Sequence, residues 1–315
     1  MPEKYQLISE NNDSTVVSDY VSPYQRATSY QSEAQLEQEL IKQLQAQAYE
    51  YLPIKSEADL IHNLHTQLEK LNDYTFTDAE WQRFFAERIA NGNEDIADKT
   101  FKIQEDSTQL LQRDNGEVIN IRLLDKTNIH KNCLQVINQY EVSGARDNRY
   151  DVTLLVNGLP LVHIELKRRG VPLQEAFNQI NRYQRDSFWA GSGLFEYIQL
   201  FVISNGTHTK YYSNTTRWQH INEAGKSDSH RSKKTSNSFE FTSWWADANN
   251  RPITDLIDFT ATFLSKHTLL NVLTKYCVFT SDKLLLVMRP YQIVATERIL
   301  NRIQIATNYK KLGTI

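Results

Sequence analysis

Residues 149–170 read RYDVTLLVNGLPLVHIELKRRG and are the most informative stretch of the chain. Two apolar runs flank Asn157-Gly158, a dipeptide typical of tight turns between antiparallel strands. Asp151 opens the first run, and Glu165 and Lys167 end the second. Because side chains alternate along a strand, Glu165 and Lys167 share one face. The pattern predicts a β-hairpin that holds a carboxylate and an ammonium group where apolar side chains would normally lie.

The geometry of the turn decides whether Asp151 and Glu165 lie on the same face. A two-residue loop at Asn157-Gly158 would pair residue 151 with residue 164 and put the two carboxylates on opposite faces. A three-residue loop, with Gly158 in the left-handed conformation forming a bulge, would bring both carboxylates to one face. We therefore predict an odd-length turn or a bulge in this hairpin.

Two carboxylates on one face, with a backbone carbonyl between them, suit a hard cation such as Mg²⁺. Such a metal would lower the pKa of a bound water and neutralise charge on a phosphate, while Lys167 would orient the water or stabilise the phosphorane. The alternative is a surface salt bridge between strand ends. His163 lies two residues before Glu165 and so shares its face of the strand. It is either a supporting residue or a tolerated strand residue.

The rest of the chain predicts an α/β domain with helices before a mixed sheet. Apolar residues at helical spacing predict three helices, near 32–48, 56–71 and 78–89, the first opened by a Ser32–Gln35 capping box. We expect strands at 100–106, 117–124, 132–140 and 197–204, and a helix at 174–183. Asp114-Asn115-Gly116 predicts a turn.

An aspartate, a short apolar gap and Glu-x-Lys resemble the PD-(D/E)xK nuclease superfamily. Gln179 and Tyr183 form Q-x-x-x-Y on the predicted helix, where positions i and i+4 share a face. This pair resembles the RecB-like branch, in which these residues help position DNA or the active-site carboxylates. Without that context, the same pair would be read as helix packing.

The wider run, from NRYDVTLLVNGLPLVHIELKRRG through EAFNQINRYQRDSF to LFVISNGT, resembles the motor (R) subunit of type I restriction-modification enzymes, over roughly Ser29 to the end of the chain. The resemblance implies that Asp151, Glu165 and Lys167 are catalytic, with Mg²⁺ held by the two carboxylates. Gln179 and Tyr183 would support them. The superfamily also often uses an acidic residue from an early helix, and the candidates Glu33, Glu37 and Glu39 remain open.

The segment Arg289-Pro290-Tyr291-Gln292 resembles the glutamine-containing element of superfamily 2 motors, in which Gln292 would read adenine. No G-x-x-x-x-G-K-[ST] motif follows within the 315 residues. We therefore expect this chain alone neither to hydrolyse ATP nor to translocate, and we assign ATP to a full-length motor.

The expected organisation has three parts. Residues 1–28 form a flexible arm, and 29–256 form the endonuclease domain. Residues 257–315 begin a RecA-like helicase domain that is truncated before the phosphate loop. A polar insert at about 215–238 is either a solvated loop or a basic flap near DNA or nucleotide.

The resemblance implies an endonuclease that cuts double-stranded DNA after ATP-driven translocation, with separate modification and specificity subunits as partners. A repair or recombination nuclease of the same superfamily, a catalytically silent docking module and an adenine-binding ATPase are the alternatives. A net charge of −3 gives no global signal for nucleic acid. With no apolar run of about 18 residues and two distant cysteines, we expect a cytoplasmic protein that does not enter a membrane.

Overall fold

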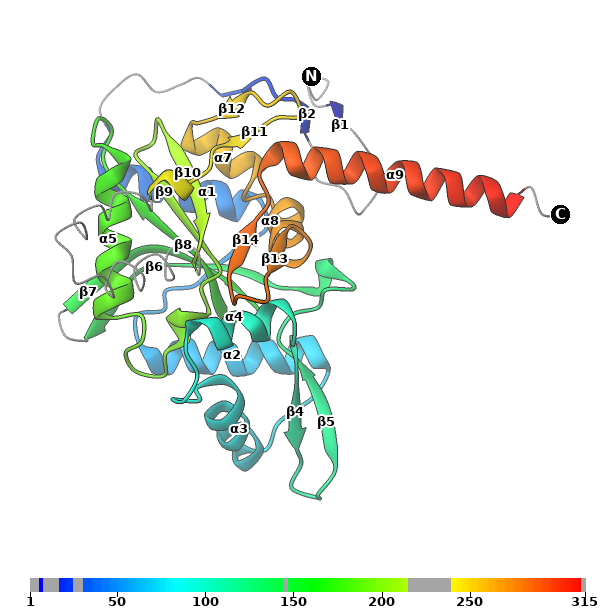
Figure 1. Cartoon of the computed structure of the whole chain (residues 1–315). Helices are drawn as coiled ribbons and strands as arrows, with labels where there is room; N and C mark the ends of the chain where they lie inside the picture. Colours follow the sequence, from blue (N-terminus) through cyan, green and yellow to red (C-terminus); the bar gives the residue numbers. More distant parts are fainter. Residues whose placement is uncertain (1–5, 8–16, 25–30, 144–146, 215–238, 313–315) are drawn as a thin grey trace, which may run out of the picture.

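A six-stranded mixed sheet forms the centre of the computed structural model (Figure 1), which describes residues 6–7, 17–24, 31–143, 147–214 and 239–312. The strand order is β10-β9-β8-β7-β6-β3. The bounds are β3 Glu50–Tyr51, β6 Leu134–Ser143, β7 Asp147–Val156, β8 Leu159–Leu166, β9 Leu200–Ser204 and β10 Thr209–Ser213. The expectation of a mixed α/β fold with helices flanking the sheet is confirmed.

The middle of the sheet combines hairpins with one helical crossover. β7 pairs antiparallel with both β6 and β8, whereas β8 and β9 run parallel. Parallel neighbours need a long connection, and here α5 (Leu173–Asp186) supplies it. Every residue of β8 and β9 is buried, as expected for strands covered on both faces.

The first two helices follow the sequence pattern closely. α1 spans Glu33–Ala46 and opens with the predicted capping box between Ser32 and Gln35. α2 spans Glu57–Asn72 and buries Leu60, Leu64 and Leu68 on one face. The third predicted helix is also confirmed, although it divides into α3 (Asp78–Phe84) and the π-helical turn η1 (Phe85–Ile89).

One predicted strand is wrong. Residues 100–106 lie in or just after helix α4 (Ile96–Gln104), whose N-cap Asp95 accepts hydrogen bonds from Ala97 N and Asp98 N. This strand was predicted as one of two flanking the turn at Asp114-Asn115-Gly116, but Asp95 and Asp98 form a capping box that starts a helix. The strand that pairs across the predicted turn is instead β4 (Thr108–Gln112), opposite β5 (Val118–Arg122).

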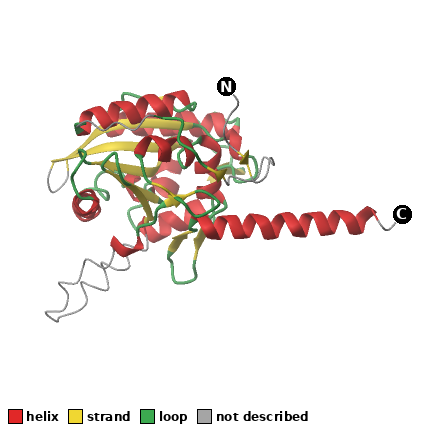
Figure 2. Ribbon diagram, turned by 90° about the horizontal axis from the view of Figure 1, so that it is seen from above, coloured by secondary structure: helices red, strands yellow, loops and turns green. Residues whose placement is uncertain are grey.

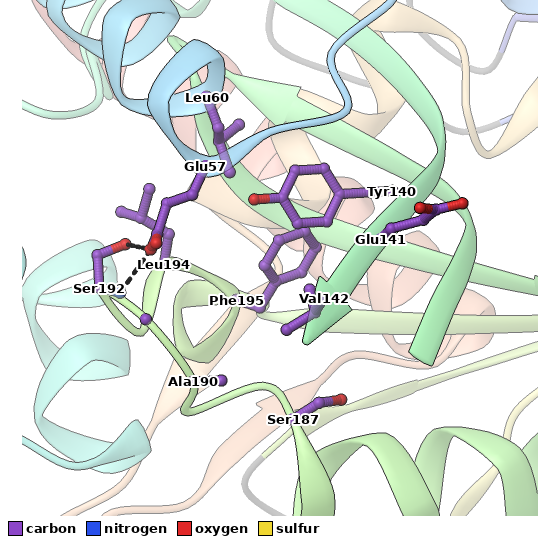
Figure 3. A pocket seen from close by; sticks show the side chains of 11 residues that line it. Glu57, Leu60, Tyr140, Glu141, Val142, Ser187, Ala190, Ser192, Leu194 and Phe195 are labelled. Atoms are coloured by element: carbon purple, nitrogen blue, oxygen red, sulfur yellow. Dashed lines mark hydrogen bonds between the residues drawn. The ribbon is translucent and has the colours of Figure 1, made fainter. Parts of the chain in front are cut away.

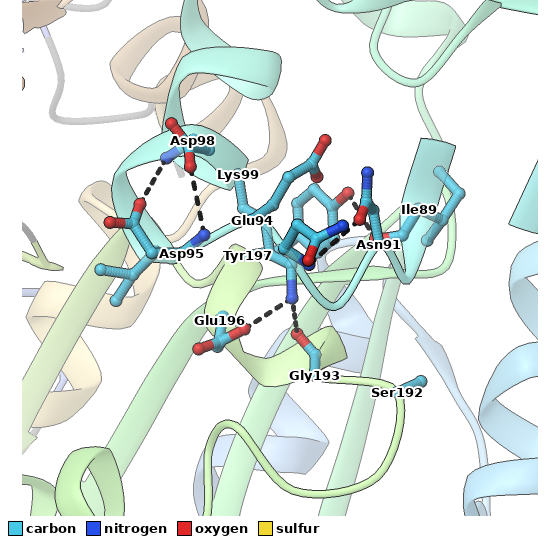
Figure 4. Close-up of polar contacts among 12 residues, drawn as sticks. Ile89, Asn91, Glu94, Asp95, Asp98, Lys99, Ser192, Gly193, Glu196 and Tyr197 are labelled. Atoms are coloured by element: carbon cyan, nitrogen blue, oxygen red, sulfur yellow. Dashed lines mark hydrogen bonds and ion pairs between the residues drawn. The ribbon is translucent and has the colours of Figure 1, made fainter. Parts of the chain in front are cut away.

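Elements α2 to β5 (residues 57–122) form a lobe beside the central sheet. Helix α4 attaches this lobe to the segment that leads into β9 (Figure 4). Lys99 Nζ contacts Glu196 Oε2 at 2.6 Å and donates to Gly193 O at 3.0 Å. Tyr197 lies in the 3₁₀ turn η3 (Leu194–Tyr197) and donates its hydroxyl to Ile89 O. Two elements of the lobe therefore hold the η3 segment.

The C-terminal part contains α7 (Leu256–Thr262), α8 (Lys266–Thr274), the hairpin β13 (Cys277–Phe279) and β14 (Leu285–Val287), and α9 (Pro290–Leu312). α7 lies on α1, since Gln43 Nε2 donates to Ile257 O and Gln47 Nε2 donates to Thr260 O. α9 extends away from the rest of the chain (Figure 2). The expected boundary at 256/257 falls inside α7 and stays a prediction.

Two short pairings complete the described elements: β1 (Gln6–Leu7) with β2 (Val17–Asp19), and β11 (Trp245–Ala246) with β12 (Pro252–Ile253). The 3₁₀ turn η2 covers Ile129–Lys131. The predicted insert at 215–238 and most of the N-terminal arm lie outside the described residues. None of the helices in the described ranges has the length and apolar character needed to cross a bilayer.

Candidate active site

The β7–β8 hairpin contains the predicted irregularity, but at another position. The loop has two residues, Asn157 at φ 52° and Gly158 at φ 83°, so the odd-length turn, one of the two predicted alternatives, does not occur. The register shifts further along, because Leu154 faces Val162 whereas Leu155 faces Pro160. Leu161 is therefore the extra residue of a β-bulge in β8.

The bulge aligns the two carboxylates. Beyond it, Thr153 faces His163 and Val152 faces Ile164, so the same register continued by one residue puts Asp151 opposite Glu165. Directly opposed residues on antiparallel strands point to the same face. The prediction of a bulge that brings both carboxylates to one face is confirmed.

Polar contacts join Asp151, Glu165 and Lys167 at the end of the hairpin. Asp151 Oδ2 accepts a hydrogen bond from Leu166 N at 2.9 Å. Lys167 Nζ donates to Glu165 Oε1 and to Leu166 O, each at 3.0 Å. The ammonium group thus lies against both a carboxylate oxygen and a backbone carbonyl.

Burial raises the pKa of both carboxyl groups. For Asp151, the repulsive charge of Glu165 raises the pKa further, and the hydrogen bond from Leu166 N only partly opposes this. For Glu165, whose side chain is fully buried, the charge of Lys167 partly opposes the effect of burial. Two carboxylates held together with little access to solvent are costly unless a cation compensates them.

The site offers carboxylate and carbonyl oxygen atoms to a cation. Glu165 Oε2 is buried and accepts no hydrogen bond from the described residues. It lies on the same strand end as Leu166 O and opposite Asp151, so the donor set consists of hard oxygen atoms. In the described ranges, His, Cys, Asp and Glu form no group of three or more arranged to hold a metal. Mg²⁺ often uses one or two carboxylates and takes its other ligands from water and phosphate, so the residues present fit it.

Helix α5 brings Gln179 and Tyr183 to the hairpin. Gln179 Nε2 donates to the Tyr183 hydroxyl, which in turn donates to Arg149 O at 2.8 Å. Burial raises the pKa of the Tyr183 hydroxyl, and the charges of Glu165 and Asp151 raise it further. The two predicted supporting residues therefore contact each other and fix the backbone two residues before Asp151.

The three early acidic candidates differ in their surroundings. Glu33 Oε1 accepts a hydrogen bond from Arg168 N at 3.4 Å, and the charge of Glu33 raises the pKa of Glu165. Glu37 instead accepts hydrogen bonds from Asn138 and Gln139 of β6, and Glu39 accepts one from Gln31. Glu33 is the candidate whose charge acts on Glu165, and its role stays a prediction.

His163 is fully buried beneath Glu165, and burial lowers the pKa of its imidazole. Its Nδ1 lies 3.2 Å from Thr153 Oγ1, and its Nε2 lies 3.4 Å from Glu165 Oε2. Sequence reasoning did not single out Thr153. The pairing of residues 153 and 163 follows only once the bulge is located, so no sequence signal pointed to it.

Gln292 lies on a different part of the fold, in the first turn of α9. Its side-chain oxygen accepts a hydrogen bond from Arg289 N at 2.8 Å. This contact fixes the start of the helix, and adenine binding by Gln292 stays a prediction.

A pocket of about 210 Å³ lies beside the hairpin, between the start of α2, the end of β6 and the loop after α5 (Figure 3). Its wall includes Tyr140, which pairs with Tyr150, the neighbour of Asp151. Glu57 lines the pocket and accepts hydrogen bonds from the backbone and hydroxyl of Ser192. Since Glu57 and Glu141 both line the pocket, it is poorly suited to a phosphate group.

Comparisons with known proteins agree on one family. Residues 30–220 match the family model described as type I restriction enzyme R protein N terminus. The chain is 49% identical over 298 residues to the type I restriction enzyme EcoprrI endonuclease subunit of Escherichia coli. The matched region covers 94% of this chain and 90% of that protein. It is 37% identical over 279 residues to the SsaAORF53P endonuclease subunit of Staphylococcus saprophyticus, and 36% identical to the SauMSSORF170P endonuclease subunit of Staphylococcus aureus. In both staphylococcal cases the match covers 87% of this chain but 27% of the relative.

Proposed function

The chain belongs to the type I restriction enzyme R protein family, and from this membership we propose that it contains a Mg²⁺-dependent DNA endonuclease centre. Asp151 and Glu165 would hold the metal, Lys167 would act on the reacting phosphate, and Gln179 and Tyr183 would support them. The observation that carries the proposal is the convergence of the buried Glu165 and the half-buried Asp151, opposed across the hairpin, with a lysine ammonium 3.0 Å from Glu165.

A bound Mg²⁺ would supply an activated water and neutralise charge on the scissile phosphate. The protein's own residues would prepare that site. Leu166 N orients the Asp151 carboxylate by donating to Oδ2. Lys167 could place its ammonium group on a phosphate oxygen as negative charge develops there. Because Tyr183 donates to Arg149 O, α5 would keep the N-terminal half of β7 in position.

The topology supports assigning the sheet to the PD-(D/E)xK superfamily. Two antiparallel strands carry the acidic residues, and a helix with Gln179 and Tyr183 crosses to a parallel third strand. We further propose that residues 257–315 begin a RecA-like motor domain, in which Gln292 would read adenine. ATP would be used by the full-length subunit, since these 315 residues contain no phosphate-loop motif.

In the complete complex, we propose that separate modification and specificity subunits select the DNA site. The motor would translocate double-stranded DNA, and the centre at Asp151 and Glu165 would cut it. The named relatives support this proposal by being endonuclease subunits of type I restriction enzymes.

The direct test is cleavage of a circular plasmid by the full-length subunit with its partners, Mg²⁺ and ATP. We expect Glu165→Ala to leave the plasmid uncut while ATP hydrolysis in the same tubes stays normal. Glu141→Ala, which removes an exposed carboxylate from β6, is the matched control and should cut like the wild type. Cutting by Glu165→Ala would place the active site elsewhere. A wild-type complex that hydrolyses ATP but never cuts would support a catalytically silent docking module.

A further inference from the structure

His163 is a fully buried polar residue within an aromatic environment. Four aromatic rings surround its imidazole in edge-to-face arrangements, with distances between ring centroids of 5.6 to 6.5 Å. They belong to Tyr150, Tyr183, Phe188 and Phe201. Placing an imidazole in such a site costs free energy unless its nitrogen atoms find partners. An apolar side chain would fill the same space without that cost, so the polar atoms of His163 need an explanation.

The two nitrogen atoms of His163 differ in what surrounds them. Nδ1 lies 3.2 Å from the hydroxyl of Thr153, the residue that faces His163 across the hairpin. Nε2 is buried and has no hydrogen-bond partner among the described residues. It lies 3.4 Å from Glu165 Oε2, which is also buried and also without a partner. The two atoms therefore lie within ion-pair distance behind the proposed metal ligand, but they are not aligned for a hydrogen bond with each other.

The tautomer of the imidazole decides whether this contact is favourable. With the proton on Nε2, the ring could donate to Glu165 Oε2 once a small rotation aligns the two groups, while Nδ1 accepts from the Thr153 hydroxyl. With the proton on Nδ1, the Nε2 lone pair would point at an ionised carboxylate and repel it. The Thr153 hydroxyl can donate or accept and so fits both tautomers, whereas the ionised Glu165 carboxylate only accepts and favours the Nε2–H form.

We infer that His163 is a positioning residue for Glu165, with its Nε2–H holding the carboxylate in the orientation that binds Mg²⁺ and the Thr153 hydroxyl holding the ring through Nδ1. The inference rests on the proposed function, because it assigns His163 to the same metal site. A ligand carboxylate is usually oriented by a hydrogen bond from behind, and loss of such a partner typically weakens metal affinity by about 10–100-fold.

Two substitutions at His163 separate its two contacts. The amide of glutamine extends about as far from the backbone as imidazole Nε2, so His163→Gln keeps a donor for Glu165. The amide of asparagine extends about as far as Nδ1, so His163→Asn keeps the contact with Thr153 but loses the reach to Glu165. A role limited to filling space predicts no difference between the two variants in metal affinity.

The experiment is calorimetric titration of this 315-residue chain with MgCl₂, accompanied by thermal unfolding with and without the metal. We expect His163→Asn to weaken Mg²⁺ binding by about 10-fold or more, and His163→Gln to bind within about 3-fold of the wild type. Thr153→Val should weaken binding in the same direction, because it removes the hydroxyl that holds the ring through Nδ1. Thr153→Val also tests the inference if a His163 variant fails to fold.

Glu165→Gln distinguishes failure of this inference from failure of the proposed site. If Glu165→Gln binds Mg²⁺ like the wild type, the metal is not held by Glu165 and the proposed function itself fails. If Glu165→Gln loses binding while His163→Asn and Thr153→Val bind normally, the metal site stands and the role of His163 is overturned.

Discussion

Lys167 touches two oxygen atoms that a cation at this site would use, Glu165 Oε1 and Leu166 O. In the absence of metal, the ammonium group therefore provides part of the positive charge that the carboxylates require. Because Mg²⁺ would compete for the same atoms, Lys167 cannot be needed to hold the metal in place. Its proposed task begins only when a phosphate group enters the site.

Replacing Lys167 by alanine should therefore separate metal binding from cleavage. We expect Lys167→Ala to bind Mg²⁺ at least as tightly as the wild-type chain in a calorimetric titration. The full-length complex with this change should lose about 100-fold or more in plasmid cleavage, since a group that stabilises developing charge is missing. Weakened Mg²⁺ binding would instead make Lys167 part of the structure that supports the metal ligands.

The pH dependence of stability follows from the raised pKa values of Asp151 and Glu165. An unfolded carboxyl group has a pKa near 4, so between that value and the raised folded pKa the unfolded chain binds fewer protons than the folded chain. The free energy of unfolding of the metal-free chain should therefore fall as pH rises through this range. Burial is the main cause for both groups.

Asp151→Asn removes one of these two carboxyl groups. We expect the variant to have a Tm about 2–6 °C above that of the metal-free wild type near pH 8 and little difference near pH 4. Asp98→Asn is the control of opposite sign. Although burial opposes the change, hydrogen bonds from Asp95 N and Lys283 leave the Asp98 pKa lowered, so this variant should lose stability at neutral pH. If Asp151→Asn and the wild type had the same Tm at both pH values, the prediction would be contradicted.

At the scale of secondary-structure elements, the turn between β7 and β8 packs against helix α2. Gly158 has φ +83°, and a Cβ atom added there would lie 2.5 Å from the backbone Cα of Leu64. Backbone atoms of a helix cannot move aside cheaply, so this turn fixes the distance between α2 and the hairpin. Gly116, in the β4–β5 turn, has φ +87° but open space around its Cα.

Comparing alanine at these two glycines isolates the packing contact. Gly116→Ala should cost about 1–2 kcal/mol, because an L-residue is strained at positive φ. Gly158→Ala carries the same strain and should lose about a further 1–3 kcal/mol through the clash with Leu64. Urea unfolding of the two variants measures the difference. Equal losses would mean that α2 can move away from the turn.

These elements also indicate how far the sequence determines the fold. The capping residue Ser32 and the regular leucines of α2 are local signals, and both helices appeared as predicted. The hairpin turn was located correctly, but the bulge at Leu161 depends on packing between strands and could only be placed by the structure. Residues 100–106 were predicted as a strand because a turn follows them, although the capping box at Asp95 starts helix α4 there.

Some residues of the candidate site could likewise be predicted from the sequence, and others could not. Asp151, Glu165 and Lys167 could be selected from their residue types and spacing. The Thr153–His163 contact could not, because it joins residues whose pairing depends on the bulge. The preference for Glu33 among the early acidic residues likewise comes from tertiary contacts between α1 and the end of β8.

At the scale of the whole molecule, charged side chains hold the segment between α5 and β9 from two separate helices. Glu57 of α2 accepts hydrogen bonds from Ser192, and Lys99 of α4 contacts Gly193 O and Glu196. Lys99 is 2% exposed, so its ammonium group depends on these partners. This segment follows directly after the helix that carries Gln179 and Tyr183. The lobe of α2 to β5 is thereby joined to the same connection that leads from the candidate site into β9.

Removing Glu196 should show how strongly this attachment contributes to the whole fold. Glu196→Ala would leave the buried Lys99 ammonium with the Gly193 carbonyl and the Tyr197 ring. We therefore expect a loss of about 3 kcal/mol in the free energy of unfolding, the low end for a broken buried pair. Glu117→Ala is the matched control, since it breaks a 2.7 Å ion pair with Arg113 on the exposed β4–β5 hairpin. Such exposed pairs contribute little, so the control should unfold like the wild type. Because Glu196 lies outside the proposed metal site, Mg²⁺ affinity below the unfolding transition should stay unchanged. A weaker affinity would show that the lobe also helps to position the carboxylates.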